Sequence, residues 1–269
     1  MDNRPIGVFD SGLGGLTAVK ALESLLPRES LVYFGDTGRV PYGTRSRETV
    51  RRYAWQDMSF LMKHQVKAVL AACGTVSSTS ADIGARLPVP YFDVLMPTAQ
   101  AAVGQTRNRR VGVIGTSASI HSGAYERTLK ELDPGLWVYP QACPLFVPLV
   151  ENGFVEPEEE VTRLVAERYL APLREAGVDT LILGCTHYPL IRETIQRVMG
   201  SGVTLVDSGR EAALALAGYL EAQEMLCGAE QPRRAEYYVS DAPENFGAVA
   251  QLFLGHAVEG KQVDLEAGA

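Results

Sequence analysis

The sequence has 269 residues, of which 46% are hydrophobic and 21% are charged. This composition is typical of a folded protein with substantial hydrophobic cores, and it excludes an intrinsically disordered chain. Acidic residues outnumber basic ones and give a net charge of −7. That charge disfavours a nucleic-acid-binding surface, and the sequence contains no local basic cluster that would offset it.

The sequence also lacks targeting signals. No apolar run approaches the roughly 18 residues of a membrane-spanning helix. The first segment, "MDNRPIGVFD", has no apolar core of the kind found in signal peptides. We therefore expect a cytoplasmic protein without a membrane partner. Its four cysteines lie far apart in the sequence, and in a reducing compartment we expect them to be free thiols.

Short apolar runs alternate with longer amphipathic segments, which is typical of parallel α/β proteins. "IGVFDSG" predicts a strand with its exit loop, and "LTAVKALESLL" predicts the helix that follows. "LVYFGD" predicts the next strand, residues 47–63 the next helix, "KAVLAAC" a third strand and "VPYFDV" a fourth. From about residue 211 we expect a helix, a strand at "RAEYYVS" and a last helix near residues 245–254, all packed against the first strands.

The second half of the chain repeats the first. "RVGVIGTSAS" matches "PIGVFDSGLG" at an offset of 105 residues, and "LWVY" matches "LVYF" at the same offset. "DTLILGCTH" matches "KAVLAACGT" at an offset of 112, and "VTLVDSG" matches "VPYFDVL" at 114. Four matches in the same order indicate a duplicated α/β unit.

The duplication predicts the fold class and the domain organisation. We expect an α/β protein with two similar domains, each built on a parallel sheet. One domain comprises residues 1–97 and 208–269, and the other comprises residues 98–207. The carboxyl ends of parallel strands form the ligand crevice of such sheets, so the active site is expected in the cleft between the domains.

Two of the matching strands end in a cysteine followed by small polar residues, at Cys73 and Cys185. A thiol between a strand and a helix lies near unpaired backbone N–H groups, which lower its pKa and also bind carboxylates. Thr75 and Thr186 add hydroxyls suited to the same anion. Inversion of a carbon centre requires two acid/base groups on opposite faces of one small substrate. A hydrolase would leave the second cysteine without a role.

Polar companions for the two thiols lie in other segments. Asp10 and Ser11 follow the first strand, where the glycines of "DSGLGG" allow the backbone to approach a ligand closely. His187 lies two residues beyond Cys185, and Glu151 follows the apolar segment "CPLFVPLV". A carboxylate beside one thiol and a histidine beside the other could orient proton transfer or hold the protonation states.

Other functions for these segments are disfavoured. "DSGLGG" is not a dinucleotide-binding fingerprint, because Thr17 occupies the third glycine position of G-x-G-x-x-G. The single residue between Cys185 and His187 does not match the spacing of zinc ligands. From these residues we therefore expect neither a bound dinucleotide nor a metal, and the family resemblance described next implies that no other cofactor is needed. Cys143 is interpreted as a buried apolar residue, and Asp36 as a turn or capping residue.

Five ordered blocks closely resemble a known family: "IGVFDSGLGGLT", "GDTGRVPYG", "AACGTVSS", "CPLFVPLVENG" and "LGCTHYPL". They are similar to the blocks of the cofactor-independent glutamate racemases of bacterial cell-wall synthesis. The resemblance covers essentially the whole chain, including "SDAPENF". It implies interconversion of L- and D-glutamate by two cysteines, which supplies D-glutamate for peptidoglycan. It also implies a homodimer.

The resemblance further implies roles for individual residues. Cys73 would act on the α-proton of D-glutamate and Cys185 on that of L-glutamate, each with the other as the returning acid. Asp10 would support Cys73, and His187 with Glu151 nearby would support Cys185. The residues expected around the carboxylates and amine of the substrate are Ser11, Pro41, Tyr42, Gly43, Thr75 and Thr186.

Gly74 departs from the family pattern, which usually has an asparagine whose amide contacts the substrate. Loss of that hydrogen bond is expected to weaken binding by about 0.5–1.5 kcal/mol, unless water or a neighbour replaces it. Two alternatives stay open. One is a racemase of the same superfamily that acts on aspartate or another small amino acid, and the other is a binding or regulatory protein of the gyrase-inhibitor type. Direct contact with nucleic acid is not expected.

Overall fold

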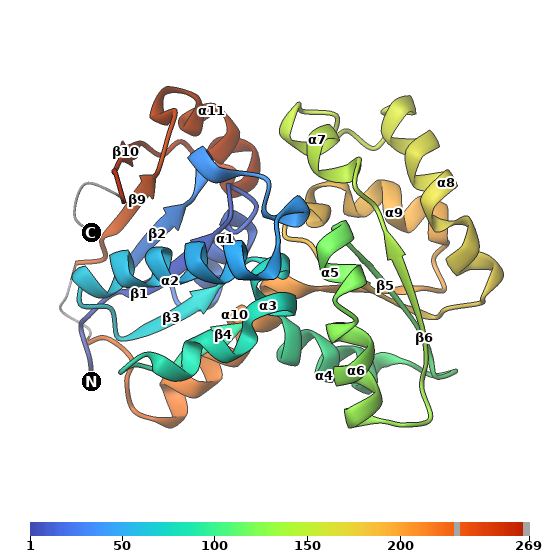
Figure 1. The fold of residues 1–269 in the computed structure, drawn as a ribbon, viewed down its shortest axis with the longest axis horizontal. Helices are drawn as coiled ribbons and strands as arrows, with labels where there is room; N and C mark the ends of the chain where they lie inside the picture. The colour runs from blue at the N-terminus through green and yellow to red at the C-terminus, as the bar shows by residue number, and fades with distance from the viewer. Residues whose placement is uncertain (229–231, 266–269) are drawn as a thin grey trace.

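The computed structural model describes residues 1–228 and 232–265 and places them on two parallel sheets, with helices on both faces of each (Figure 1). The first sheet has the described strand order β10-β9-β2-β1-β3-β4. Its strands are β1 (Ile6–Asp10), β2 (Leu31–Gly35), β3 (Ala68–Ala71), β4 (Tyr91–Asp93), β9 (Ala235–Val239) and β10 (Gly260–Gln262). We call this sheet and the helices packed on it the first unit: α1 (Leu16–Leu25), α2 (Arg47–Lys63), α3 (Gly74–Ser80), α10 (Ser208–Ala222) and α11 (Pro243–Leu254).

The second sheet has the strand order β6-β5-β7-β8. Its strands are β5 (Arg110–Gly115), β6 (Trp137–Ala142), β7 (Thr180–Leu183) and β8 (Thr204–Asp207). With its helices it forms the second unit: α4 (Leu95–Gln105), α5 (Ser117–His121), α6 (Ala124–Leu132), α7 (Phe146–Glu151), α8 (Glu160–Glu175) and α9 (Arg192–Met199). Four short 3-10 helices complete the described chain, η1 (Thr37–Arg39), η2 (Tyr42–Thr44), η3 (Ala81–Arg86) and η4 (Tyr188–Ile191).

The sequence of each element explains its place in these layers. The strands β1, β2, β3 and β7 are buried throughout, as expected for parallel strands covered by helices on both faces. The helix α1 buries Leu16, Val19 and Leu22 on one face. The helix α2 begins where the Ser46 side chain accepts a hydrogen bond from the backbone N–H of Thr49. No helix in the described ranges is both long and apolar enough to cross a membrane.

The strand order β2-β1-β3-β4 of the first unit recurs as β6-β5-β7-β8 in the second. The duplication predicted from the sequence is therefore confirmed in the topology. One of the four sequence matches is shifted. Leu31 pairs with Ile6, but Val138 rather than Leu136 pairs with the matching Val111. A shift of two residues leaves every side chain on the same face of a strand, so the apolar pattern does not reveal it.

The C-terminal segment packs against the first unit, as predicted. Strand β9 pairs with β2, and α11 packs against α1. The helix begins at Pro243, slightly earlier than expected, and proline is favoured in the first turn of a helix because its missing N–H needs no partner there. The predicted domain boundary at residue 97 lies inside α4, which contacts β7 and β8, and the division into residue ranges stays a prediction.

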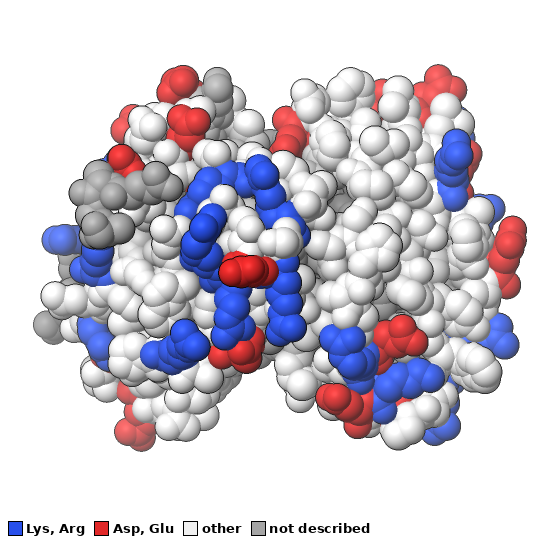
Figure 2. Space-filling view, viewed as in Figure 1, with Lys and Arg blue, Asp and Glu red and all other residues white. Residues whose placement is uncertain are grey.

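Basic side chains gather on one face of the first unit, which the sequence analysis did not anticipate. Figure 2 shows Lys and Arg grouped on the face where α2 lies, around acidic side chains. Arg47 lies one turn of α2 before the adjacent residues Arg51 and Arg52, and Arg51 pairs with Asp82 at 2.5 Å. In the sequence Glu48 and uncharged residues separate Arg47 from Arg51 and Arg52, and only in the folded chain does Asp82 join them.

Candidate active site

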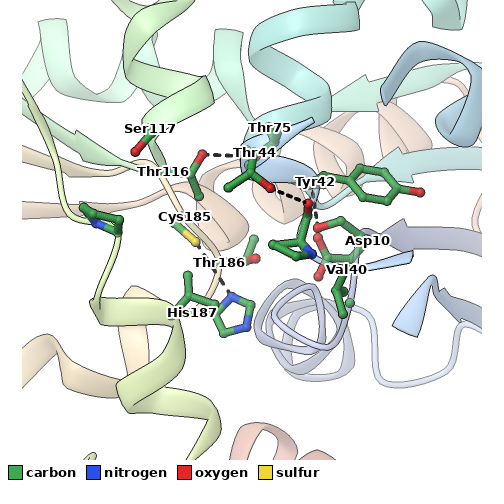
Figure 3. A pocket seen from close by; sticks show the side chains of 18 of the residues that line it. Asp10, Val40, Tyr42, Thr44, Thr75, Thr116, Ser117, Cys185, Thr186 and His187 are labelled. Atoms are coloured by element: carbon green, nitrogen blue, oxygen red, sulfur yellow. Dashed lines mark hydrogen bonds between the residues drawn. The ribbon is translucent and has the colours of Figure 1, made fainter. Parts of the chain in front are cut away.

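A cavity of about 290 Å³ opens between the carboxyl ends of the two sheets. That volume is slightly below the range of about 300–1,000 Å³ typical of sites for drug-sized ligands, so it suits a small metabolite. The structure brings every predicted site residue to this cavity, and they are Asp10, Ser11, Pro41, Tyr42, Gly43, Cys73, Gly74, Thr75, Glu151, Cys185, Thr186 and His187. Figure 3 shows Cys185 and His187 facing the side that carries Asp10 and Tyr42.

Cys73 reaches the cavity from the end of β3 and is almost completely buried. Its thiol donates a hydrogen bond to the Ser11 hydroxyl at 3.3 Å. Burial, reinforced by the nearby charge of Asp10, raises the pKa of Cys73 to about 12. The expected lowering of the thiol pKa by the following helix is therefore wrong for Cys73. Burial destabilises the thiolate by more than the nearby backbone N–H groups stabilise it.

Asp10 lies at the end of β1 and is also buried. One carboxylate oxygen accepts a hydrogen bond from the backbone N–H of Gly15 at 2.9 Å. Burial raises the pKa of Asp10, while the charge of His187 and the hydrogen bond from Gly15 act against that rise. Asp10 thus lies close enough to Cys73 to influence the protonation of the thiol.

Cys185 follows β7 and forms a chain of contacts with His187 and Glu151. The thiol sulfur lies 3.7 Å from His187 Nδ1, and His187 Nε2 lies 2.9 Å from Glu151 Oε1. Burial alone would lower the pKa of His187, but the hydrogen bonds to Cys185 and Glu151 outweigh it and raise this pKa to about 10. The imidazole therefore carries a proton at neutral pH and places a positive charge beside the Cys185 sulfur.

Phe253 of α11 holds the ring of His187 from outside the cavity. The two rings meet edge to face, with 5.5 Å between their centroids, an arrangement that aromatic pairs favour. The C-terminal helix of the first unit therefore helps to orient a side chain of the second unit.

Comparison with known proteins agrees with this arrangement. The model of the Asp/Glu/Hydantoin racemase family matches residues 10–216. The chain belongs to the Asp/Glu/Hydantoin racemase family. It is 46% identical to a glutamate racemase from Chlorobaculum tepidum over 253 residues, which cover 93% of this chain and 92% of that relative.

Solved racemase structures have the same fold as this family member. A glutamate racemase isoform from Bacillus anthracis is 35% identical, with a TM-score of 0.94 over 98% of this chain and 99% of that one. A glutamate racemase from Francisella tularensis, solved in complex with D-glutamate, is 38% identical, with a TM-score of 0.92 over 99% of this chain and 100% of that one. The predicted two-sheet α/β architecture is thus the racemase fold.

Thr116 belongs to the cavity of this racemase-family chain but was not predicted. It lies at the end of β5, and its hydroxyl is 3.1 Å from that of Thr75. The pair connects the two units, as the dashed line in Figure 3 shows. The repeat contained the signal that identifies Thr116, because "GTSAS" matches "DSGLG" and places Thr116 opposite Ser11 in the duplicated unit.

A buried acidic cluster lies behind the cavity. The Tyr42 hydroxyl donates hydrogen bonds to Asp36 and to Asp57, the latter at 3.0 Å. Arg39 bonds to the same carboxylates, at 2.6 Å and 2.9 Å, and the Ser240 hydroxyl donates to Asp36 at 2.8 Å. Burial and the charge of Asp36 raise the pKa of Asp57 well above its usual range. Asp36 stands at the N-cap of η1, as expected, but its side chain makes no capping hydrogen bond and belongs to this cluster instead.

Cys143 is buried, as expected, and its backbone carbonyl accepts a hydrogen bond from the Tyr188 hydroxyl at 3.0 Å. It does not line the cavity. Within the described ranges, no group of three or more His, Cys, Asp or Glu side chains is arranged to hold a metal ion.

Proposed function

We propose that this protein is a cofactor-independent glutamate racemase that uses Cys73 and Cys185 as its two acid/base groups. One observation carries the proposal: two cysteines from equivalent strand ends of a duplicated fold line the same small cavity, each with its own polar partners. Racemisation requires a base on one face of the α-carbon and an acid on the other. Family membership and the names of the relatives support glutamate as the substrate.

The protonation states support opposite starting roles for the two cysteines. The raised pKa of Cys73 keeps it a thiol at neutral pH, so it starts as a proton donor. The raised pKa of His187 keeps a positive charge beside Cys185, the cysteine to which we assign the role of base. Bound L-glutamate would lose its α-proton to Cys185, and the Cys73 thiol would deliver a proton to the opposite face to form D-glutamate. The reverse reaction exchanges the two roles.

The partners of each cysteine would assist these proton transfers. Asp10 would hold Cys73 in its donor state and help to recover its proton afterwards. Glu151 would orient His187 and stabilise its positive charge. These assignments rest on the contacts of Cys73 and His187 described above.

The other cavity residues would position the substrate. The hydroxyls of Ser11, Thr75 and Thr186 are suited to hydrogen bonds with the carboxylates, and we add Thr116 to this group. The loop that contains Pro41, Tyr42 and Gly43 would contact the substrate, and Gly74 lines the same cavity.

The cellular role follows from the reaction. D-Glutamate made by this enzyme would enter peptidoglycan synthesis in the cytoplasm. We further propose a homodimer in which each chain folds as two domains, residues 1–97 with 208–269 and residues 98–207.

The test is to incubate the protein with D-glutamate in heavy water, with a thiol reductant and no added cofactor. Loss of optical rotation with deuterium at the α-carbon is the expected result. A folded protein with free thiols that leaves D-glutamate unchanged would overturn the proposal. Aspartate and other small amino acids, tested in the same way, distinguish a related racemase from a binding or regulatory protein, which would act on none of them.

A further inference from the structure

Gly74 lies directly against the backbone of the other unit. A Cβ atom at this position would overlap the carbonyl oxygen of Gly184, and it would lie 3.3 Å from the carbonyl carbon of Gly184 and 3.8 Å from Cys185 Cα. Gly74 immediately follows Cys73, and Gly184 immediately precedes Cys185. The two backbone segments that carry the thiols therefore touch at a point where there is no room for a side chain.

The backbone of Gly184 is held in place and cannot easily move away from Gly74. The backbone N–H of Gly184 donates to the Ile114 carbonyl of β5 at 2.8 Å. A Cβ at Gly184 would itself lie 2.7 Å from that carbonyl oxygen. Because Gly184 is held between α3 on one side and β5 on the other, a side chain at position 74 could be accommodated only by moving one unit away from the other.

The contact also belongs to the wall of the cavity, because Gly74 and Gly184 both line it. The hydrogen-bonded pair of Thr75 and Thr116 lies beside it and joins the same two units. The chain passes between the sheets after β4 and again after β8. Opening the cleft about these two crossings would relieve an overlap at position 74 without unfolding either sheet.

We propose that Gly74 sets how far the cleft closes and thereby sets the separation of Cys73 from Cys185 across the substrate. The inference rests on the racemase function proposed above. Glutamate racemases usually have asparagine at this position. The Cβ atom of an asparagine would not fit between the two units at their present separation. Gly74 is thus a positioning residue, which lacks a side chain that could contact the substrate but allows a narrower cleft.

This proposal and simple loss of an amide predict opposite effects for Gly74→Asn. If the glycine merely removes a hydrogen bond, Gly74→Asn restores it, and KM falls with kcat preserved or raised. If Gly74 sets the closure, both Gly74→Asn and Gly74→Ala hold the thiols apart. A displacement of about 1 Å at a reacting group costs on the order of 100-fold in rate, so we expect kcat to fall roughly 10- to 100-fold in both variants.

Gly104→Ala is the matched control, since a Cβ at that exposed position in α4 would meet no atom within 4 Å. We expect it to leave kcat and KM unchanged. Circular dichroism and thermal unfolding of all variants verify the fold. A Gly74→Ala protein that does not fold would overturn the proposal, because the contact would then belong to the core rather than to an adjustable cleft.

A second measurement is independent of the proposed reaction. Dibromobimane becomes fluorescent when it bridges two thiols, and mass spectrometry then identifies the bridged pair. We expect bridging of Cys73 to Cys185 in the wild type and in Gly104→Ala, and a several-fold lower yield in the Gly74 variants. Equal yields in all four proteins would overturn the inference about closure. Altered bridging in a protein that racemises no amino acid would instead overturn only the proposed function.

Discussion

Glu151 Oε1 lies 2.9 Å from Nε2 of His187, on the side of the imidazole that faces away from Cys185. This carboxylate helps to hold the pKa of His187 at about 10 against the effect of burial. The positive charge beside Cys185 therefore depends on a residue of α7, which lies 36 positions before His187 in the chain.

Replacement of Glu151 by Gln tests this dependence. The amide keeps a hydrogen-bonding partner but removes the charge, so we expect the pKa of His187 to fall by about 1 unit. His187 then loses its proton at a lower pH, and the alkaline limb of the kcat/KM profile moves to lower pH. Glu156→Gln, at a residue outside the active-site cavity, is the control. An unchanged alkaline limb in Glu151→Gln would contradict the assigned role.

The two-base mechanism predicts that neither cysteine is dispensable. Cys73→Ala and Cys185→Ala are each expected to lower racemisation more than about 1,000-fold, within the range that general acid/base groups contribute. Both variants should keep the wild-type circular dichroism spectrum, because removal of one sulfur at the cavity wall leaves the sheets intact. Cys227→Ser changes a thiol outside the cavity and should racemise normally. Normal racemisation by either alanine variant would exclude the mechanism.

Asp10→Asn should change the protonation of Cys73. The charge of Asp10 contributes to the raised pKa of this thiol, second to burial. Removing the charge is expected to lower the pKa of Cys73 by about 1 unit. The pH dependence of alkylation measures it, in a protein that also carries Cys185→Ala and Cys227→Ser so that Cys73 is the reactive thiol. If the alkylation profile does not move, Asp10 acts on the substrate rather than on Cys73.

Tyr42→Phe should destabilise the protein through the buried acidic cluster. The substitution leaves Asp36 and Asp57 without the hydroxyl that both accept from. Arg39 still bonds to both carboxylates, so the cost is that of losing the hydroxyl's hydrogen bonding, about 0.5–1.5 kcal/mol, and urea unfolding should show a loss of this size. We also expect a higher KM, because the loop beside Tyr42 lines the cavity. Tyr219→Phe, outside both the cluster and the cavity, is the matched control, and an equal loss in both variants would contradict this assignment.

The local sequence determined which residues could form the site. Apolar runs ending in Cys73 and Cys185 identify strands whose carboxyl ends carry the thiols, because the strand period and the sheet edge are local properties. Repetition of those runs predicted the duplicated topology, and the motif residues Asp10, Glu151 and His187 all reach the cavity. Thr116 was also accessible to this reasoning through the repeat.

Only the tertiary structure decided the energetics of these groups. The pKa of Cys73 rises rather than falls because burial depends on what the rest of the chain packs around the thiol. Asp57 of α2 joins Asp36 and Tyr42 through the Tyr42 hydroxyl and Arg39, and no pattern along the chain predicts that approach.

The contact of Gly74 with Gly184 shows the same distinction. The sequence alone determined that position 74 has no side chain, and it suggested only a lost hydrogen bond. The distance between the backbones of Gly74 and Gly184 depends on how the two sheets are packed against each other. Burial and packing between units are set by all the atoms of the interface together, and for this reason the width of the cleft could be obtained only from the folded molecule.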